Sequence, residues 1–145
     1  MMTEVVKVLQ SRILIIDSNR INAEFIAEGL KNVHFQVIVA ANNHEALGIM
    51  AKELPDLILL SSGIEGQAIC RQVRELCDIP IVIMSESNNK SEELQSLNAG
   101  ADDFITIPFS MDILASRIKA IIRRNARIQP IRTQATAAEF ALEHA

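Results

Sequence analysis

The chain lacks the surplus of basic side chains that usually accompanies non-specific binding to nucleic acids. It holds 14 lysines and arginines against 18 aspartates and glutamates, a formal net charge of -4. Direct DNA binding is therefore not expected. The chain also lacks an apolar run near the roughly 20 residues that span a bilayer, and its N-terminus, MMTEVVKVLQ, lacks a signal-peptide pattern. We expect a cytoplasmic protein that does not contact membranes.

Cysteine and histidine are too few and too scattered to indicate a disulfide framework or a metal site. Cys70 and Cys77 lie in a stretch with a helical pattern, which places them about 10 Å apart, too far for a disulfide. His34, His44 and His144 lack the spacing of metal ligands. No glycine-rich phosphate loop and no pair of nucleophile and base is visible. The sequence predicts no cofactor, no metal and no enzymatic activity.

What the chain does have is a regular alternation of short apolar runs and helical patterns. The runs cover residues 13–16, 35–40, 57–60, 81–84 and 104–107, and the helical patterns cover about residues 20–31, 43–53, 66–76, 90–99 and 110–125. Most runs are apolar throughout, which is typical of strands covered on both faces. The alternation predicts an α/β fold, a doubly wound five-stranded parallel sheet. We expect one domain over residues 12–125, preceded by an N-terminal extension over 1–11.

The last 20 residues, 126–145, have a different pattern and are predicted to be a linker or the start of a helix that connects to an output domain. Pro130 interrupts the helical pattern, and residues 136–139 form a capping box. A helix begun there has about two turns before Ala145, which is marginal without a packing partner. Either it docks on this domain or the sequence is a fragment of a longer protein, and we favour the fragment.

Ligand sites in such folds form at the carboxyl edge of the sheet, because loops from neighbouring strands diverge there and leave a crevice. The side chains that follow the predicted strands at this edge are mostly small and polar. The candidate site residues are Asp17, Ser18, Ser61, Ser62, Ser85 and Ile107.

Three stretches of the sequence resemble the receiver domain of two-component response regulators. They are RILIID at residues 12–17, DLILL at 56–60 and AGADDFITIPFSMDILASRIKAIIRR at 99–124. The resemblance covers about residues 12–124 and implies the flavodoxin-like (βα)5 receiver fold. The third stretch is similar to receivers that precede winged-helix DNA-binding domains, in which the fourth helix, fifth strand and fifth helix form a dimer face.

The resemblance also implies a set of site positions, and this chain departs from the family at most of them. Family members use two acidic residues after the first strand to hold magnesium, an aspartate phosphoacceptor after the third, a serine or threonine after the fourth and a lysine after the fifth. Matching positions here are Asp17 and Ser18, then Ser61, Ser85 and Ile107. A shift of one residue in the third loop would make Ser62 the equivalent of the acceptor.

These changes remove the groups that phosphoryl transfer needs. A single carboxylate at Asp17 is a poor magnesium site. The Ser61 hydroxyl is not ionised near neutral pH and has no evident base beside it, so it does not replace a carboxylate nucleophile. Without the lysine, no fixed cation stabilises a phosphoryl group. The loop from Ser61 to Gly66 is also roughly three residues shorter than in family members. The sequence predicts a degenerate, non-phosphorylatable pseudo-receiver.

Several of these positions also have a purely structural interpretation. Asp17 is either a relic of the metal site or a cap for the following helix, and Ser85 is expected to satisfy local backbone groups. The resemblance implies a cis peptide between Ile107 and Pro108. It also places Phe104 at the aromatic switch position, where we expect a fixed ring in the core or an interface.

The predicted partner surface carries acidic groups before the fifth strand and basic groups along the fifth helix. The residues are Asp102, Asp103, Arg117, Lys119, Arg123 and Arg124. A symmetric dimer would bring the two sets together. The resemblance implies an ion pair between chains for Asp103 and Arg117 and an interface position for Arg124. The alternative is a solvated helix face, where exposed pairs often contribute only about 0–1 kcal/mol.

Two functions follow from this sequence. The first is a pseudo-receiver that acts by protein–protein interaction, as a homodimer or with another signalling protein, ahead of a C-terminal output domain such as a winged helix or a diguanylate cyclase. The second is a switch that works without family phosphorylation and senses a small ligand or a serine modification in the vacated acidic pocket.

Overall fold

The computed structural model describes residues 10–62, 64–107 and 109–128, which form alternating strands and helices. The elements are β1 (Arg12–Ile16), α2 (Arg20–Asn32), β2 (Gln36–Ala40), α3 (Asn43–Lys52), β3 (Leu57–Ser61), α4 (Ile64–Leu76), β4 (Ile81–Ser85), α5 (Lys90–Asn98), β5 (Asp103–Thr106) and α6 (Met111–Ile128). Every predicted strand and helix is present, most within two residues of its predicted bounds.

The strands form one parallel sheet in the order β2-β1-β3-β4-β5, which confirms the predicted doubly wound, flavodoxin-like fold. The chain reverses its direction of winding beside β1, so the carboxyl ends of β1 and β3 flank the point where a crevice opens. This order brings Asp17, after β1, close to Ser61, the last residue of β3.

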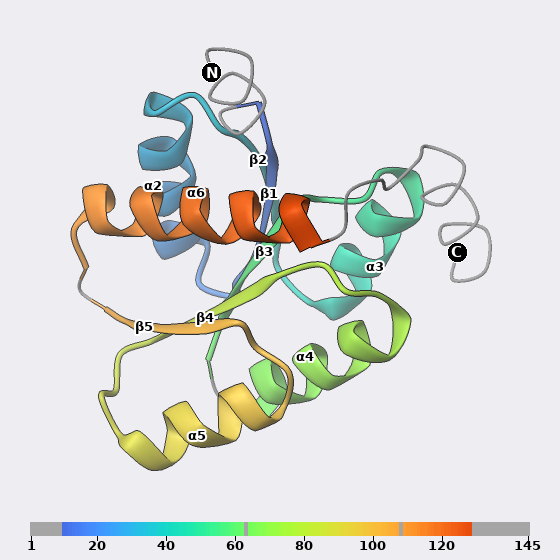
Figure 1. The fold of residues 1–145 in the computed structure, drawn as a ribbon, viewed down its shortest axis with the longest axis vertical. Coiled ribbons are helices and arrows are strands. Elements are labelled where there is room, and N and C mark those ends of the chain that lie inside the picture. The colour runs from blue at the N-terminus through green and yellow to red at the C-terminus, as the bar shows by residue number, and fades with distance from the viewer. Residues whose placement is uncertain (1–9, 63, 108, 129–145) are drawn as a thin grey trace.

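Helices cover both faces of the sheet, which explains why the strands are apolar throughout. Figure 1 shows α2 and α6 together on one side and α4 and α5 on the other. The core is accordingly double: Ile13, Ile15, Leu57 and Leu59 face α2 and α6, while their neighbours along β1 and β3 face α3 and α4. Burial of both strand faces is the main stabilising contribution of the sheet.

The start of α2 differs from one of the structural interpretations of Asp17. The helix begins at Arg20, and its cap is Asn19, whose side chain accepts a hydrogen bond from the Asn22 backbone N–H at 3.0 Å. Asparagine is among the best N-cap residues because its short side chain reaches the unpaired N–H groups of the first turn. The prediction that Asp17 caps this helix was therefore wrong.

The helix α4 begins earlier than predicted, and it does not include Cys77 as the helical pattern had indicated. It begins at Ile64, two residues early, and ends at Leu76, so Cys77 lies just beyond the helix. Neither cysteine forms a disulfide: Cys70 is buried against the sheet and Cys77 is half-buried.

Three sequence predictions fall on residues outside the described ranges: most of the N-terminal extension, the peptide bond to Pro108 and the capping box at 136–139. The helix before this last stretch, α6, continues to Ile128. Among the described helices, none is long and apolar enough to cross a membrane.

Candidate functional site

Four of the five predicted pocket positions meet in one crevice at the carboxyl edge of the sheet. A cavity of about 320 Å³ is lined by Asp17, Ser61, Ser85 and Ile107, together with Ser62, Asn22 and Glu92. Ser18 faces a second cavity of about 390 Å³ on the other side of the end of β3, which shares Asp17, Ser61 and Ser62 with the first. The end of β3 thus divides the predicted site into two hollows.

Asp17 is held by nitrogen donors from the start of α2. Its side chain accepts hydrogen bonds from the Asn19 backbone N–H through Oδ1 and from the Asn22 side-chain amide through Oδ2, each at 2.9 Å. The residue is only 4% exposed, and its own N–H donates to the Ala40 carbonyl at 3.0 Å. Hydrogen bonds to an ionised acceptor are stronger than neutral ones, so these donors offset the burial of the carboxylate. Asp17 connects β1, the end of β2 and the first turn of α2.

The predicted metal positions do not fit a resident magnesium ion. Magnesium is usually held through carboxylates with near-octahedral geometry. The predicted metal positions supply one carboxylate, and both of its oxygens already face N–H donors. Within residues 10–62, 64–107 and 109–128, no group of three or more His, Cys, Asp or Glu side chains is arranged to hold a metal ion.

Ser85 is also fully engaged within the chain. Its hydroxyl donates to Glu92 Oε1 at 2.8 Å and accepts from the Ser87 backbone N–H at 3.0 Å, and the residue is 2% exposed. Its carbonyl accepts the Ile107 N–H at 2.6 Å, which joins the ends of β4 and β5. The prediction that Ser85 satisfies local backbone groups is confirmed, and the bond to Glu92 is additional.

The start of α4 lies directly against the end of β3. A Cβ atom at Gly66 would overlap the Ser61 carbonyl oxygen, so only glycine fits this close approach. Ser62 is fixed as well, since its N–H donates to the Met84 carbonyl at 2.8 Å. The backbone at the predicted acceptor position is therefore confined between β4 and α4.

The predicted dimer-face residues form ion pairs within one chain. Arg117 contacts Asp103 at 3.1 Å, with the two side chains 47% and 30% exposed. Asp102 accepts from Arg74 at 2.9 Å and from the Ile81 N–H at 2.8 Å. The remaining interface position, Arg124, is exposed on α6, and the Phe104 ring is buried. Whether Asp103 and Arg117 also pair between chains stays a prediction.

Arg74 is a structural residue that the sequence did not reveal. Its guanidinium donates to the carbonyls of Gly100, Cys77 and Ile79 at 2.8–3.3 Å, in addition to Asp102. It thereby joins the end of α4 to the loops that precede β4 and β5. Neighbouring Cys70 is buried, and this desolvation raises the pKa of its thiol, while the Arg74 charge opposes the shift.

Other residues of the crevice were also missed, namely Asn19, Asn22 and Glu92. Two of them could have been found from the sequence. Asn19 is a good cap residue placed just before a helix, and Glu92 is an acidic residue in the first turn of α5. The amide of Asn22 had no signal, because its partner Asp17 becomes a neighbour only once β1 and α2 are packed.

Comparisons with known proteins agree with this architecture. The family model described as the response regulator receiver domain matches residues 13–119. The chain is 32% identical over 118 residues to a probable transcriptional regulator, ycf27, of Porphyridium aerugineum, covering 79% of this chain and 49% of that protein. It is 33% identical over 117 residues to the response regulator MprA of Mycolicibacterium vanbaalenii, covering 78% and 51%. The chain thus spans about half the length of these two relatives.

A solved structure gives the same result. The chain is similar to a two-component response regulator from Clostridium difficile, with 34% identity, a TM-score of 0.74 and coverage of 79% of this chain and 98% of that one. The family model covers most of the described residues. It includes all five strands, except for Arg12, the first residue of β1. This chain belongs to the response regulator receiver domain family.

Proposed function

We propose that this receiver domain acts by protein–protein interaction and does not accept a phosphoryl group. The observation that carries the proposal is the presence of Ser18, Ser61 and Ile107 where the resemblance implies an acid, an aspartate and a lysine. Each replacement removes a separate requirement of the reaction: a second metal ligand, the nucleophile and the fixed cation.

The contacts around the remaining two positions support the proposal. Asp17 and Ser85 are buried, and both are held by partners within the chain. A phosphoryl group would have to displace the Glu92 carboxylate from the Ser85 hydroxyl, and the carboxylate would repel it. These side chains therefore stabilise the crevice in one arrangement.

The second function is a switch that senses a ligand or a modification in this crevice. The same contacts support it less well than they support a protein-interaction domain. A ligand gains affinity where polar groups are left without partners, and the buried side chains of Asp17 and Ser85 already have them. Ser61 and Ser62 are half-buried and line both hollows, so they are the residues at which modification would act.

We propose the face formed by β5 and α6 as the interaction surface. Asp103 and Arg117 are both partly exposed, so their pair can be exchanged for a pair between chains at small energetic cost. In a two-fold symmetric homodimer, Asp103 of each chain would pair with Arg117 of the other, so the symmetry forms two such pairs at once.

The test is incubation with acetyl phosphate and magnesium, followed by intact mass and sedimentation velocity on the same samples. We expect no phosphoryl adduct and no change in assembly, while a phosphorylatable receiver treated in parallel gains one phosphoryl group. An adduct on this chain would refute the proposal, and peptide mapping would then examine Asp17, Ser61 and Ser62. Arg117→Glu tests the interface separately: it should abolish a dimer, and Arg20→Glu, on α2, is the matched control.

A further inference from the structure

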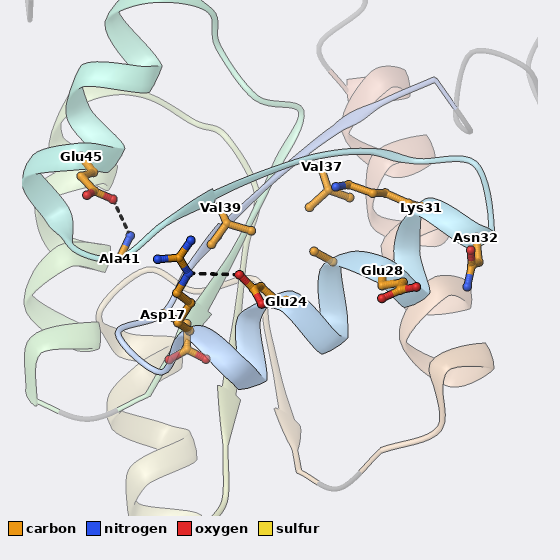
Figure 2. Close-up of a pocket in the computed structure, with 11 residues that line it drawn as sticks. Asp17, Glu24, Glu28, Lys31, Asn32, Val37, Val39, Ala41 and Glu45 are labelled. Atoms are coloured by element: carbon orange, nitrogen blue, oxygen red, sulfur yellow. Dashed lines mark hydrogen bonds and ion pairs between the residues drawn. The ribbon is translucent and has the colours of Figure 1, made fainter.

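A groove of about 880 Å³ follows the free edge of β2, at the opposite end of the sheet from β5. Figure 2 shows its floor and walls: Val37 and Val39 of β2 on one side, Glu24, Glu28 and Lys31 of α2 on the other.

The β2 edge carries backbone groups that are available for pairing. The Gln36 N–H donates to Ser11 and the Ala40 carbonyl accepts from Asp17, so these even-numbered residues direct their polar groups toward β1. Backbone groups alternate in direction along a strand, and those of Val37 and Val39 therefore point away from β1. β2 has β1 as its one neighbour in the described sheet, so the N–H and C=O groups of both valines have no strand partner there.

The edge also lacks the features that usually protect exposed strands. Its sequence, QVIVA, contains no charge and no proline, and Val39 is 37% exposed. Natural edge strands are commonly blocked by lysine, proline or a bulge because an open edge pairs with other chains. At the other end of the sheet, β5 is only four residues long and begins with the ion-paired Asp103.

The walls of the groove carry an excess of negative charge. Four acidic residues line it, Asp17, Glu24, Glu28 and Glu45, against two basic ones, Arg20 and Lys31. Arg20 is already paired with Glu24 at 3.0 Å, and Glu45 accepts from the Ala41 N–H at 2.8 Å. Glu28 makes no hydrogen bond or ion pair with the described residues. The groove is therefore complementary to a positively charged occupant.

We propose that this edge binds an extended, basic segment of a partner protein, which adds to the sheet as a sixth strand beside β2. Its backbone pairs with Val37 and Val39. Its lysines or arginines project on the face that carries α2 and lie along the acidic wall, and its apolar side chains project on the opposite face, beside Ile38. Strand addition of this kind derives affinity from the backbone and specificity from alternate side chains. The inference is independent of whether the domain accepts a phosphoryl group.

The charge order on α2 argues against a second copy of this chain as the occupant. Along the helix the groove-lining charges run Arg20, Glu24, Glu28, Lys31. An antiparallel pairing of two β2 strands would place two antiparallel α2 helices side by side, with acids opposite acids and bases opposite bases. A basic peptide has no such conflict.

The experiment is a titration of the full chain with capped hexapeptides, followed by amide chemical shifts. We expect a peptide of alternating valine and lysine to shift the amides of β2 and α2, and its valine–glutamate counterpart to bind at least about tenfold more weakly. Val39→Pro removes an outward N–H that the β1 ladder does not use, and edge strands tolerate proline at such positions. It should weaken binding about tenfold relative to Val39→Ala, which keeps the N–H.

Methylated peptides test the backbone pairing without altering the protein. Methyl groups on the amide nitrogens of one alternate set of peptide residues should abolish binding, and those on the other set should be tolerated. The proposal would be overturned if methylation of the two alternate sets had equal effects on binding. It would also be overturned if Val39→Pro bound the peptide as well as the parent does, or if the peptide shifted only the amides of β5 and α6. A concentration-dependent dimer that Val39→Pro dissociates would also overturn it, because the edge would then be occupied by a second copy.

Discussion

Replacement of Asp17 by alanine tests whether this carboxylate now serves the fold. In a receiver built to hold a cation, an acid at this position adds negative charge to a pocket that needs a metal to offset it. Here the carboxylate accepts two hydrogen bonds from the start of α2 and is 4% exposed. Its removal should therefore destabilise the protein, whereas removal of an acid from a cation pocket should stabilise it or have little effect.

The expected loss follows from the two bonds. A hydrogen bond to a charged group contributes about 1.5–3 kcal/mol, and the donors left behind lose a buried partner. Because the Asn22 side chain is only half-buried, its amide can bond to water instead, and this lowers the free energy lost on removal of Asp17. We expect Asp17→Ala to reduce the free energy of unfolding by about 2–4 kcal/mol, or the melting temperature by about 10 °C.

The assay is urea denaturation followed by far-UV circular dichroism, with equal slopes required before free energies are compared. Asp78→Ala is the matched control, because Asp78 is exposed and should change stability by less than about 0.5 kcal/mol. Asp17→Asn should lie between the two, since one acceptor oxygen is kept and the charge is lost. An Asp17→Ala variant as stable as the parent, or more stable, would refute the argument that α2 donors have replaced a cation.

Other contacts give further expected outcomes. Gly66→Ala should destabilise the protein by about 1–3 kcal/mol in the same assay, because its Cβ would overlap the Ser61 carbonyl; a neutral result would show that α4 shifts freely. Arg74→Met keeps much of the side-chain volume and should cost about 2–4 kcal/mol, since several carbonyls lose their donor; a loss below 1 kcal/mol would mean that water replaces it. Burial raises the pKa of Cys70, so iodoacetamide at neutral pH should label Cys77 first, as measured by peptide mass; equal rates would show that the α4 packing opens readily.

The fold was predictable because its signals are local. Each strand is an apolar run bounded by polar residues, and each helix has its own periodicity, so the bounds followed from the printed sequence. The errors fall where one contact decides the result. Asp17 and Asn19 are both good cap residues, and the structure assigns the cap to Asn19 because Asp17 is still held beside β1.

The crevice was predictable in its location but not in its hydrogen bonds. Parallel strands must end at one edge, which is why Asp17, Ser61 and Ser85 were expected to meet. The bond from Ser85 to Glu92 depends on the path from β4 to α5, and the pair between Asp103 and Arg117 depends on how α6 lies over β5. Such side-chain partners are set by packing and leave no pattern along the chain.

The close contact of α4 with β3 leads to a last prediction about the proposed loss of phosphorylation. The substitutions Ser18→Asp, Ser61→Asp and Ile107→Lys supply the three groups that the resemblance implies at these positions. The acceptor position would still lie against Gly66, and Ser18 would still face the other hollow from Ser85. We expect no adduct from acetyl phosphate and magnesium in this triple variant, and an adduct only when roughly three residues are also inserted after Ser62. The insertion without the three substitutions is the control. Phosphorylation of the triple variant alone would mean that the replaced side chains are the whole barrier, and that the short loop and the Asp17 contacts evolved without consequence for the chemistry.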